Sequence, residues 1–504
     1  MPNNDFDVII IGAGLGGLLC GVMLAKEGKK VCILEKNRQI GGCLQTFAFQ
    51  KKVFDACVHY VGGLREGSGL NKIFSYAGIL DKLSLKSLDT RGFDKIIFGE
   101  EQVEYPLANR VHFVESLLPF FPNEKNALQE YLRKISEVVS HFPLYNLRSG
   151  EASEKDAVVG LDLMQVLRGL TSNERLVKVL AGNNFLYAGI DGQTPFYAHA
   201  LSMDGFLHSA DKVLPGSSQI AKFLWKELVT HGGQILRNSE VKQLEEVEGK
   251  IIWAMTADGQ KWQAKTFISA VPTSVLLSLT DSKAFRPAFR ERVKTMPHTP
   301  AAVMLNLVLK PATVAYPRRN IYWHPSGNVF GKESESGMVW PDTQAFFYNE
   351  DEQNPGCAES LSILTYAEGG SFSAWEDSLN ITGIHAKRNE AYECQKEEVM
   401  DKVLAKTFSR FPELKSAIVA KSMASPLSFR DYTGTPHGSL YGPIKDVRFP
   451  AQTQIGLRTK ISNLFLTGQN VNLHGVMGVS ITAVATCAEL LGMQYLLAKI
   501  NRAS

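Results

Sequence analysis

The chain has 504 residues, of which 44% are hydrophobic and 21% are charged, and its formal net charge is +3. A chain of this length and composition buries a sizeable core and divides into more than one structural domain. The small net charge gives no indication of a nucleic-acid partner. Seven cysteines without a C-x-x-C spacing indicate neither a disulfide framework nor a metal site, and they fit a reducing cytoplasm.

The N-terminal segment has the pattern of a nucleotide-binding β-α-β unit. An apolar strand from Asp7 to Ile11 runs into a glycine-rich turn, and an apolar helix follows and ends near Gly28. Glycine is needed in such a turn because the backbone approaches a pyrophosphate and the helix lies close against the sheet. Amide groups at the start of the helix then bind the phosphates. The residues predicted to form this phosphate site are Gly12, Gly14, Leu15, Gly16 and Gly17.

A second strand, Val31 to Leu34, ends in an acidic residue at the interval expected for a nucleotide ribose. Glu35 is predicted to accept hydrogen bonds from the ribose hydroxyls, which favours an unmodified adenosine. Lys36 and the pair Gly41-Gly42 follow, and we expect them to contact the same nucleotide.

The C-terminal region supplies a second set of cofactor contacts. The segment from Ile461 to Thr467 reads as a buried parallel strand that breaks at a glycine followed by polar side chains, which could hold a ribitol chain. An apolar helix then begins at Gly475, and its first amides could face the edge of a flavin on which negative charge builds on reduction. We therefore expect FAD. The predicted contacts here are Gly468, Gln469, Asn470, Gly475, Met477, Gly478 and Val479.

These motifs resemble the flavoprotein family of phytoene desaturases, carotenoid isomerases and retinol saturases. The resemblance covers most of the chain and is strongest at residues 41–47, 54–62 and 467–478. The middle segment is most similar to the retinol saturase branch, the all-trans-retinol 13,14-reductases. Cys57 departs from that branch, which usually has a small, glycine-like residue at this position, and Asn470 stands where an aspartate is common.

The resemblance implies an α/β fold, with a Rossmann-type FAD-binding domain and an inserted α+β substrate domain, as in amine oxidases and phytoene desaturases. We expect the FAD-binding domain to comprise residues 1–74, 205–280 and 425–504, and the substrate-binding domain to comprise 75–204 and 281–424. In the middle FAD-binding piece, Ser217-Ser218 is predicted to cap a helix that ends at His231, and a strand follows over 234–237. By resemblance the backbone at Val241 meets the adenine.

An Asp258-Gly259 turn is predicted to join strands around 251–253 and 267–270 into a hairpin. The first insertion reads as mostly helical, with helices over 114–121 and 128–139. The second reads as strands over 302–309, 321–323, 345–348 and 361–366, followed by a helix over 397–408. Aromatic residues of the insertions are candidates for the wall of a lipid tunnel, namely Phe185, Tyr187, Phe196, Tyr197, Trp323, Phe346, Phe347 and Tyr348.

Three side chains are candidates for proton transfer: His59, Tyr60 and His474. The resemblance places their segments beside the isoalloxazine ring, where a flavin enzyme needs an orienting group and a proton donor or acceptor. His59 could instead only bind backbone near the flavin, and His474 could only shape the loop before Gly475. Arg430 and Asp431 are expected to form a structural ion pair.

The resemblance implies an FAD-dependent oxidoreductase that saturates, desaturates or isomerises carbon–carbon double bonds of an isoprenoid or polyene lipid, with saturation favoured. An FAD-dependent amine oxidase and a flavin-binding protein without catalysis are the alternatives. No other glycine cluster has the spacing of a second dinucleotide site, so transient NAD(P)H or a quinone is expected as electron partner.

The uncharged run Val8 to Ala25 contains five glycines and follows acidic residues, so we predict neither a membrane span nor a signal peptide. The apolar run Phe113 to Phe121 could lie in a membrane interface as a short amphipathic element. We expect a cytoplasmic protein, with peripheral contact at the inner face of a membrane as a further expectation, an apolar lipid substrate and no nucleic-acid partner. No protein partner is inferable.

Overall fold

A parallel sheet assembled from three separate parts of the sequence is the centre of the fold. The computed structural model describes residues 6–330, 340–379 and 388–503. The strand order is β10-β2-β1-β14-β20, and every neighbouring pair is parallel. These strands are β1 (Phe6–Ile11), β2 (Val31–Leu34), β10 (Gln234–Leu236), β14 (Ala264–Ser269) and β20 (Leu464–Leu466). Their near-continuous apolar runs are typical of parallel strands buried on both faces.

A group of helices packs against this sheet and against one another. They are α1 (Leu15–Lys26), α2 (Gly69–Ala77), α8 (Ser218–Thr230), α14 (Gly475–Leu491) and α15 (Met493–Arg502). Helix α1 is buried along nearly its whole length and packs between α8 and α14. Glycines allow this close packing, because a Cβ on Gly17 would lie 2.1 Å from the Gly12 carbonyl oxygen.

A three-stranded antiparallel sheet flanks the parallel one and corrects one prediction. It comprises β11 (Val241–Val247), β12 (Lys250–Thr256) and β13 (Lys261–Trp262). The predicted turn at Asp258-Gly259 is present, but it joins β12 to the two-residue strand β13, whereas residues 267–269 pair in parallel with β1. The predicted second strand of the hairpin is wrong, because the longer apolar run, which includes residues 267–269, belongs to the buried parallel sheet.

The start of α8 corrects a second prediction. Ser217 has helical backbone angles, and its side chain does not cap the helix. Its amide and hydroxyl each donate a 2.7 Å hydrogen bond to Asp55 instead. A buried carboxylate from a distant segment therefore takes the place of the local contact that the sequence suggested.

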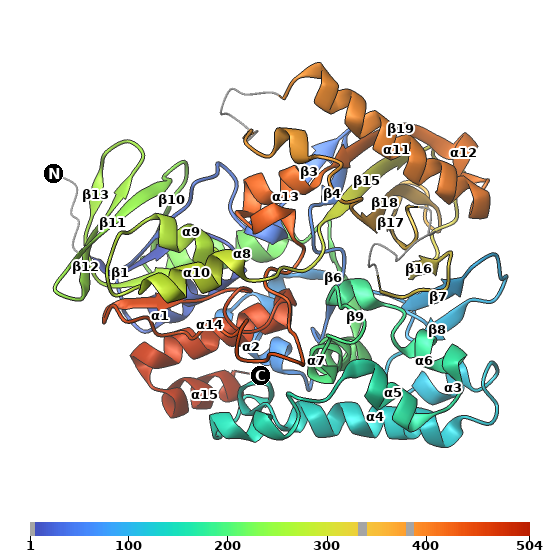
Figure 1. Cartoon of the computed structure of the whole chain (residues 1–504), viewed down its shortest axis with the longest axis horizontal. Coiled ribbons are helices and arrows are strands. Elements are labelled where there is room, and N and C mark those ends of the chain that lie inside the picture. The colour runs from blue at the N-terminus through green and yellow to red at the C-terminus, as the bar shows by residue number, and fades with distance from the viewer. Residues whose placement is uncertain (1–5, 331–339, 380–387, 504) are drawn as a thin grey trace.

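A seven-stranded mixed sheet forms the second half of the molecule, to the right in Figure 1, in the order β19-β15-β18-β17-β16-β7-β8. Its strands are β7 (Asp94–Phe98), β8 (Tyr105–Leu107), β15 (Ala302–Leu309), β16 (Asn320–His324), β17 (Gln344–Glu350), β18 (Ala358–Tyr366) and β19 (Ile418–Ala424). The four predicted strands are present. The prediction missed β7, β8 and β19, so the first insertion is less purely helical than expected. Helices α11 (Glu390–Arg410) and α12 (Leu414–Ala417) lie beside this sheet, and α11 contains the predicted helix 397–408.

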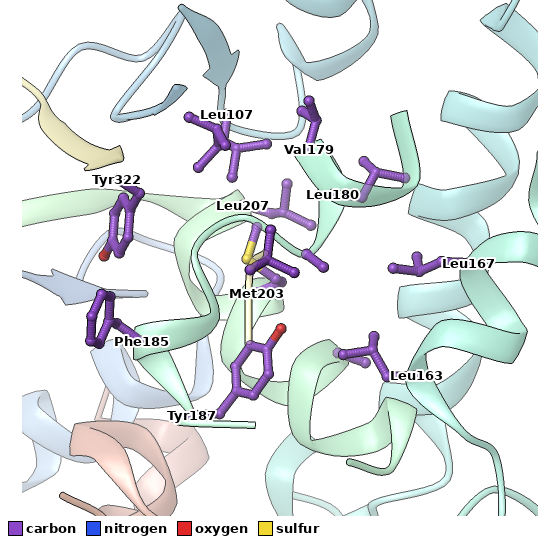
Figure 2. Close-up of a cluster of buried hydrophobic side chains, with 14 of the residues drawn as sticks. Leu107, Leu163, Leu167, Val179, Leu180, Phe185, Tyr187, Met203, Leu207 and Tyr322 are labelled. Carbon is purple, nitrogen blue, oxygen red and sulfur yellow. The ribbon is translucent and has the colours of Figure 1, made fainter. Parts of the chain in front are cut away.

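The helices of the first insertion enclose a hydrophobic core with the other side of the seven-stranded sheet, and Figure 2 shows part of that core. They are α3 (Phe113–Leu117), α4 (Lys125–Ser140), α5 (Leu163–Leu170), α6 (Glu174–Leu180) and α7 (Phe196–His208). Helix α3 ends earlier than the predicted 114–121. Phe113, Leu117 and Phe121 are buried in this core, whereas Phe120 is exposed.

Smaller elements connect the two halves. The hairpin β3 (Thr46–Phe49) with β4 (Lys52–Asp55) and a three-stranded sheet, β5-β9-β6, lie between them. The bounds of the remaining elements are β5 (Val61–Gly62), β6 (Ser84–Ser87), β9 (Ala210–Leu214), α9 (Thr273–Ser278), α10 (Pro287–Thr295) and α13 (Pro426–Thr433). Within the described ranges, no helix combines the length and apolarity needed to cross a membrane. The α/β Rossmann-type fold is confirmed, while the exact domain boundaries stay a prediction.

The contact between Gly17 and Gly12 provides a test of the packing between α1 and β1. We expect Gly17→Ala to lower stability by about 1–3 kcal/mol, because the added methyl group forces the helix away from the strand. Gly169→Ala in α5 is the matched control, since a Cβ there meets no atom within 4 Å. Urea unfolding measures both variants, and equal stability of the two would contradict the proposed close packing.

Candidate active site

A cavity of about 560 Å³ opens at the carboxyl ends of β1, β2, β14 and β20 and continues towards α7 and the seven-stranded sheet. Ligands of open parallel sheets bind at this end of the strands. All predicted site residues except Gly17 line it: Gly12, Gly14, Leu15, Gly16, Glu35, Lys36, Gly41, Gly42, His59, Tyr60, Val241, Gly468, Gln469, Asn470, His474, Gly475, Met477, Gly478 and Val479. Gly17 lies beneath the loop, where it permits helix packing.

The glycine-rich loop keeps bare backbone at one end of the cavity. A Cβ on Gly14 would meet no protein atom within 4 Å, so the space in front of it is open. Gly14 also forms an isolated bridge with Gly41, and a Cβ on Gly42 would lie 3.2 Å from the Cα of Gly14. Two backbone segments, the loop at Gly14 and the pair Gly41-Gly42, thus approach one another where the sequence predicts the pyrophosphate.

Two helices begin at this cavity without a side-chain cap. Helix α1 follows Gly14 and helix α14 follows His474, and neither residue accepts a capping hydrogen bond with its side chain. The first amides of a helix are unpaired and carry partial positive charge. Both helix starts are therefore suited to electron-rich groups of a ligand.

Glu35 is buried and holds the loop as well as lining the cavity. Its Oε2 accepts a 2.7 Å hydrogen bond from the Ala13 amide, and its Oε1 accepts one of 2.8 Å from the Asn37 amide. Burial raises the pKa of Glu35, and these amide contacts oppose the rise. Each carboxylate oxygen accepts more than one hydrogen bond, so the side chain keeps capacity for ribose hydroxyls.

The next residue, Lys36, is anchored to the protein. Its ammonium donates a 2.7 Å hydrogen bond to the Asp431 carbonyl oxygen, and burial lowers its pKa. Asp431 also forms the expected ion pair with Arg430, with 2.7 Å between Nη2 and Oδ1, and a second one of 2.6 Å with Arg388. Asp431 is thus a structural anchor, while its neighbour Tyr432 lines the cavity.

His59 is a neutral imidazole at the middle of the cavity. Its ring stacks on Phe347 at 4.3 Å between centroids, and burial, with a smaller effect from Lys212, lowers its pKa to about 3. Nε2 of His59 has no hydrogen-bond partner among the described residues. At neutral pH this histidine is not an acid, but it offers a hydrogen bond to a ligand.

His474 repeats this pattern at the start of α14. Burial, followed by the charge of Lys445, lowers its pKa to about 4, and its ring lies 4.4 Å from that of Tyr441. Its Nε2 also lacks a partner within the described part of the chain. The two candidate histidines therefore share burial, neutrality and an unsatisfied nitrogen.

Four lining side chains present such unsatisfied polar atoms: His59 Nε2, His474 Nε2, Asn37 Oδ1 and Asn470 Oδ1. Buried polar groups in folded proteins are usually hydrogen-bonded, so these atoms point to a bound group that carries matching donors and acceptors. The uncapped helix starts and the bare glycine backbone add sites for phosphates and carbonyl oxygens. Together these residues fit a flavin nucleotide.

Tyr60 belongs to a buried network that the sequence did not predict. Its hydroxyl lies 2.7 Å from that of Tyr322, and it donates a 3.0 Å hydrogen bond to Asp94 Oδ2. Asn183 and Asn320 donate further hydrogen bonds to Asp94. Burial raises the pKa of Asp94 to about 7, although these three donors lower it. The network can therefore hold a proton at neutral pH.

The end of the cavity beyond the histidines is an apolar arm, which we define by Phe185, Leu201, Phe206, Tyr322, Phe347 and Leu364. Of the eight aromatic residues predicted to line a tunnel, only Phe185 and Phe347 line the cavity. Trp323, Phe346 and Tyr348 pack in the core on the other side of the sheet. Alternation along β16 and β17, which sends Tyr322 and Phe347 to one face and their neighbours to the other, is the signal that could have identified the lining set.

Comparisons with known proteins agree with this site. The sequence model of the family of flavin-containing amine oxidoreductases matches residues 15–491 of this chain. The chain belongs to this family. It is 25% identical to the all-trans-retinol 13,14-reductase of Danio rerio, over 97% of this chain and 86% of that protein. It is 23% identical to the chloroplastic prolycopene isomerase of Arabidopsis thaliana, over 99% of this chain and 84% of that protein.

An oxidoreductase from Methanosarcina mazei has the same fold, with a TM-score of 0.63 at 15% identity, over 95% of this chain and 99% of that one. The family membership confirms the predicted flavin-dependent oxidoreductase. The specific roles of the predicted site residues stay proposals.

The open space at Gly14 separates a test of cofactor binding from a test of folding. We expect Gly14→Val to lose its bound flavin, because the side chain would occupy the place of the pyrophosphate, while the protein stays folded. Gly160→Val is the control, since its Cβ also meets no atom within 4 Å. The absorbance ratio of flavin to protein measures retention, and a full flavin content in Gly14→Val would refute the assignment of the loop.

Proposed function

We propose that this protein is an FAD-dependent oxidoreductase that adds hydrogen across a carbon–carbon double bond of an isoprenoid or other polyene lipid. The cavity continues from the glycine loop past Glu35 to Val241, which supports a dinucleotide and not a mononucleotide. Gln469 and Asn470 would hold the ribitol, and the start of α14 would face the flavin. The names of the relatives, a retinol reductase and a prolycopene isomerase, favour a polyene substrate.

The observation that carries the substrate class is the position of charge in the cavity. Among the described lining residues, four are Asp, Glu, Lys or Arg: Glu35 and Lys36 directly follow β2, Glu240 directly precedes β11, and Lys242 belongs to β11. The apolar arm has no acidic or basic side chain among its described lining residues. An ammonium substrate would lose its hydration there without a compensating carboxylate. This argues against the amine oxidase alternative and for an apolar chain.

The residues around the apolar arm would orient the substrate, exclude water and supply a proton. A bound flavin supplies two-electron chemistry to the double bond. Phe347, held by stacking on His59, would orient a planar polyene, and Phe185 and Phe206 would exclude water from it. Tyr60 and Tyr322 line the cavity at this arm, and their hydroxyls are bonded to each other and, through Tyr60, to Asp94, which would supply a proton. A built-in proton source favours saturation over desaturation.

The identity of the electron partner and the contact with a membrane remain predictions. Transient NAD(P)H or a quinone is still the expected exchange partner of the flavin. Within the run 113–121, a peripheral membrane contact would use the exposed Phe120, since Phe113, Leu117 and Phe121 are buried. A cytoplasmic location is likewise still expected.

The direct test of the proposed function is anaerobic turnover. Photoreduced protein incubated with a panel of polyene lipids should form products that are two hydrogens heavier, detected by mass spectrometry with the flavin reoxidising in parallel. Gly14→Val, which we expect to lack flavin, is the negative control. Peroxide and aldehyde formed from amines, without any change in the lipids, would instead establish the amine oxidase alternative.

The proposed proton supply from Asp94 through Tyr60 has its own test. Because Asp94 loses its proton near pH 7, saturation in the wild type should decline as the pH rises through about 7, and Asp94→Asn should lose this dependence. Tyr60→Phe should slow turnover by about 10²-fold or more, the usual contribution of a general acid.

The matched control is Tyr131→Phe, which removes a buried hydroxyl bonded to His199 at 2.8 Å outside the cavity lining. A rate for Tyr60→Phe equal to that of Tyr131→Phe would exclude Tyr60 from proton delivery.

A further inference from the structure

Two cysteines from different turns meet at the cavity. Cys43 lies in the short 3-10 helix Gly42–Leu44, and Cys57 follows β4. The β3–β4 hairpin brings them together, because Thr46 pairs with Asp55 and the Ala56 amide extends the ladder with a 2.9 Å bond to the Gln45 carbonyl. The two thiols interact with each other, and both line the cavity.

The position of this pair within the cavity is close to the two histidines. Cys57 is two residues before His59 on the same lining segment. Both cysteines line the same cavity as Tyr441, whose ring lies 4.4 Å from that of His474. The thiols therefore share the region in which the unsatisfied Nε2 atoms indicate the flavin ring.

A second cavity, of about 740 Å³, adjoins the first and reaches only one of the two cysteines. Cys57, Gly42, Asn37, Tyr432 and Thr433 line both cavities, whereas Cys43 lines only the first. The lining of the second cavity includes the exposed residues Arg38, Lys222 and Arg237. It is therefore a path by which a small, anionic molecule could reach Cys57.

The interaction between the thiols makes them chemically unequal. It lowers the pKa of Cys43 and, together with burial, raises the pKa of Cys57 well above its usual value. Cys43 is therefore the more acidic of the two thiols, and it lines only the cavity of the proposed flavin. The more acidic thiol is also the better leaving group in thiol–disulfide exchange.

We propose that Cys43 and Cys57 form a redox-active dithiol that passes two electrons to the bound flavin, an inference that rests on the flavin of the proposed function. In this step the two S–H bonds break, one S–S bond forms, the flavin takes up both electrons, and the two protons pass to the flavin and to solvent. An external low-molecular-weight thiol restores the pair. One thiolate attacks Cys57 and displaces Cys43, and a second forms the external disulfide.

Another cysteine pair shows which features matter. The Cys487 thiol donates a 3.8 Å hydrogen bond to the Cys20 carbonyl oxygen, but both cysteines are buried between α1 and α14, and neither lines either cavity. This pair lacks both a flavin surface and a path for a reductant. Cys20→Ser is therefore a matched control for substitutions at Cys43 and Cys57.

An anaerobic dithionite titration of the oxidised holoenzyme, without lipid, tests the proposal. Wild type and Cys20→Ser should take up four electrons per flavin, whereas Cys43→Ser and Cys57→Ser should take up two. Thiol counting after denaturation should give five free thiols in the oxidised wild type and all seven cysteines as thiols after reduction. Peptide mass spectrometry should identify the disulfide as Cys43–Cys57.

Two electrons per flavin in the wild type, with free Cys43 and Cys57 after oxidation, would overturn the proposal. The wild-type measurement stands even where a cysteine variant folds poorly. Because no lipid is present and the flavin absorbance is read in every sample, failure of the dithiol can be distinguished from failure of the polyene chemistry or of flavin binding. Glutathione, as an anionic thiol probe, should reduce the wild-type flavin and leave that of Cys57→Ser oxidised.

Discussion

The close approach of bare backbone at the end of the parallel sheet is the constraint on which the site depends. Two uncapped helix starts, α1 and α14, face one cavity, and a Cβ on Gly14 or Gly475 would meet no protein atom within 4 Å, so the space beside both helix starts is open. Gly17 lets α1 lie against β1, and a Cβ on Gly16 would already lie 3.2 Å from the Cα of Gly468. Glycine at these points fixes the helices where their partial positive charge is exposed to a ligand. The positions of the histidines and of the apolar arm follow from that arrangement.

Local patterns predicted the nucleotide end of the site, and long-range contacts decided the rest. The glycine loop, β2 and Glu35 lie within one short stretch of sequence, so their spacing alone carries the geometry. The Tyr60–Asp94–Tyr322 network joins three segments that are far apart in sequence, and no local pattern relates them. Burial in the folded protein then sets the pKa values of these groups, and the sequence alone does not give that burial.

The errors have the same origin. An apolar run predicts a buried strand but not its partner, and for this reason the hairpin predicted for residues 267–270 is wrong, since residues 267–269 pair in the parallel sheet. Ser217 has the residue type of a helix cap, yet a buried carboxylate, Asp55, takes its hydroxyl. The prediction of one tunnel wall from the aromatic strands is wrong for Trp323 and Phe346, because neighbouring residues of a strand point to opposite faces. The period of two in β16 and β17 separates Tyr322 and Phe347, which line the cavity, from Trp323 and Phe346, which do not.

One short segment joins the chemistry proposed for the two ends of the cavity. From Cys57 to Tyr60 the chain carries a thiol, an imidazole without a partner for Nε2 among the described residues, and a phenol bonded to a proton-holding carboxyl. Saturation of a double bond requires both electrons and a proton, and neither is available from an apolar substrate or from neutral histidines. The dithiol would supply the electrons through the flavin, and the Asp94 network would supply the proton. Because charge is otherwise confined to the nucleotide end, both supplies can operate beside an apolar chain without a permanent ion in its path.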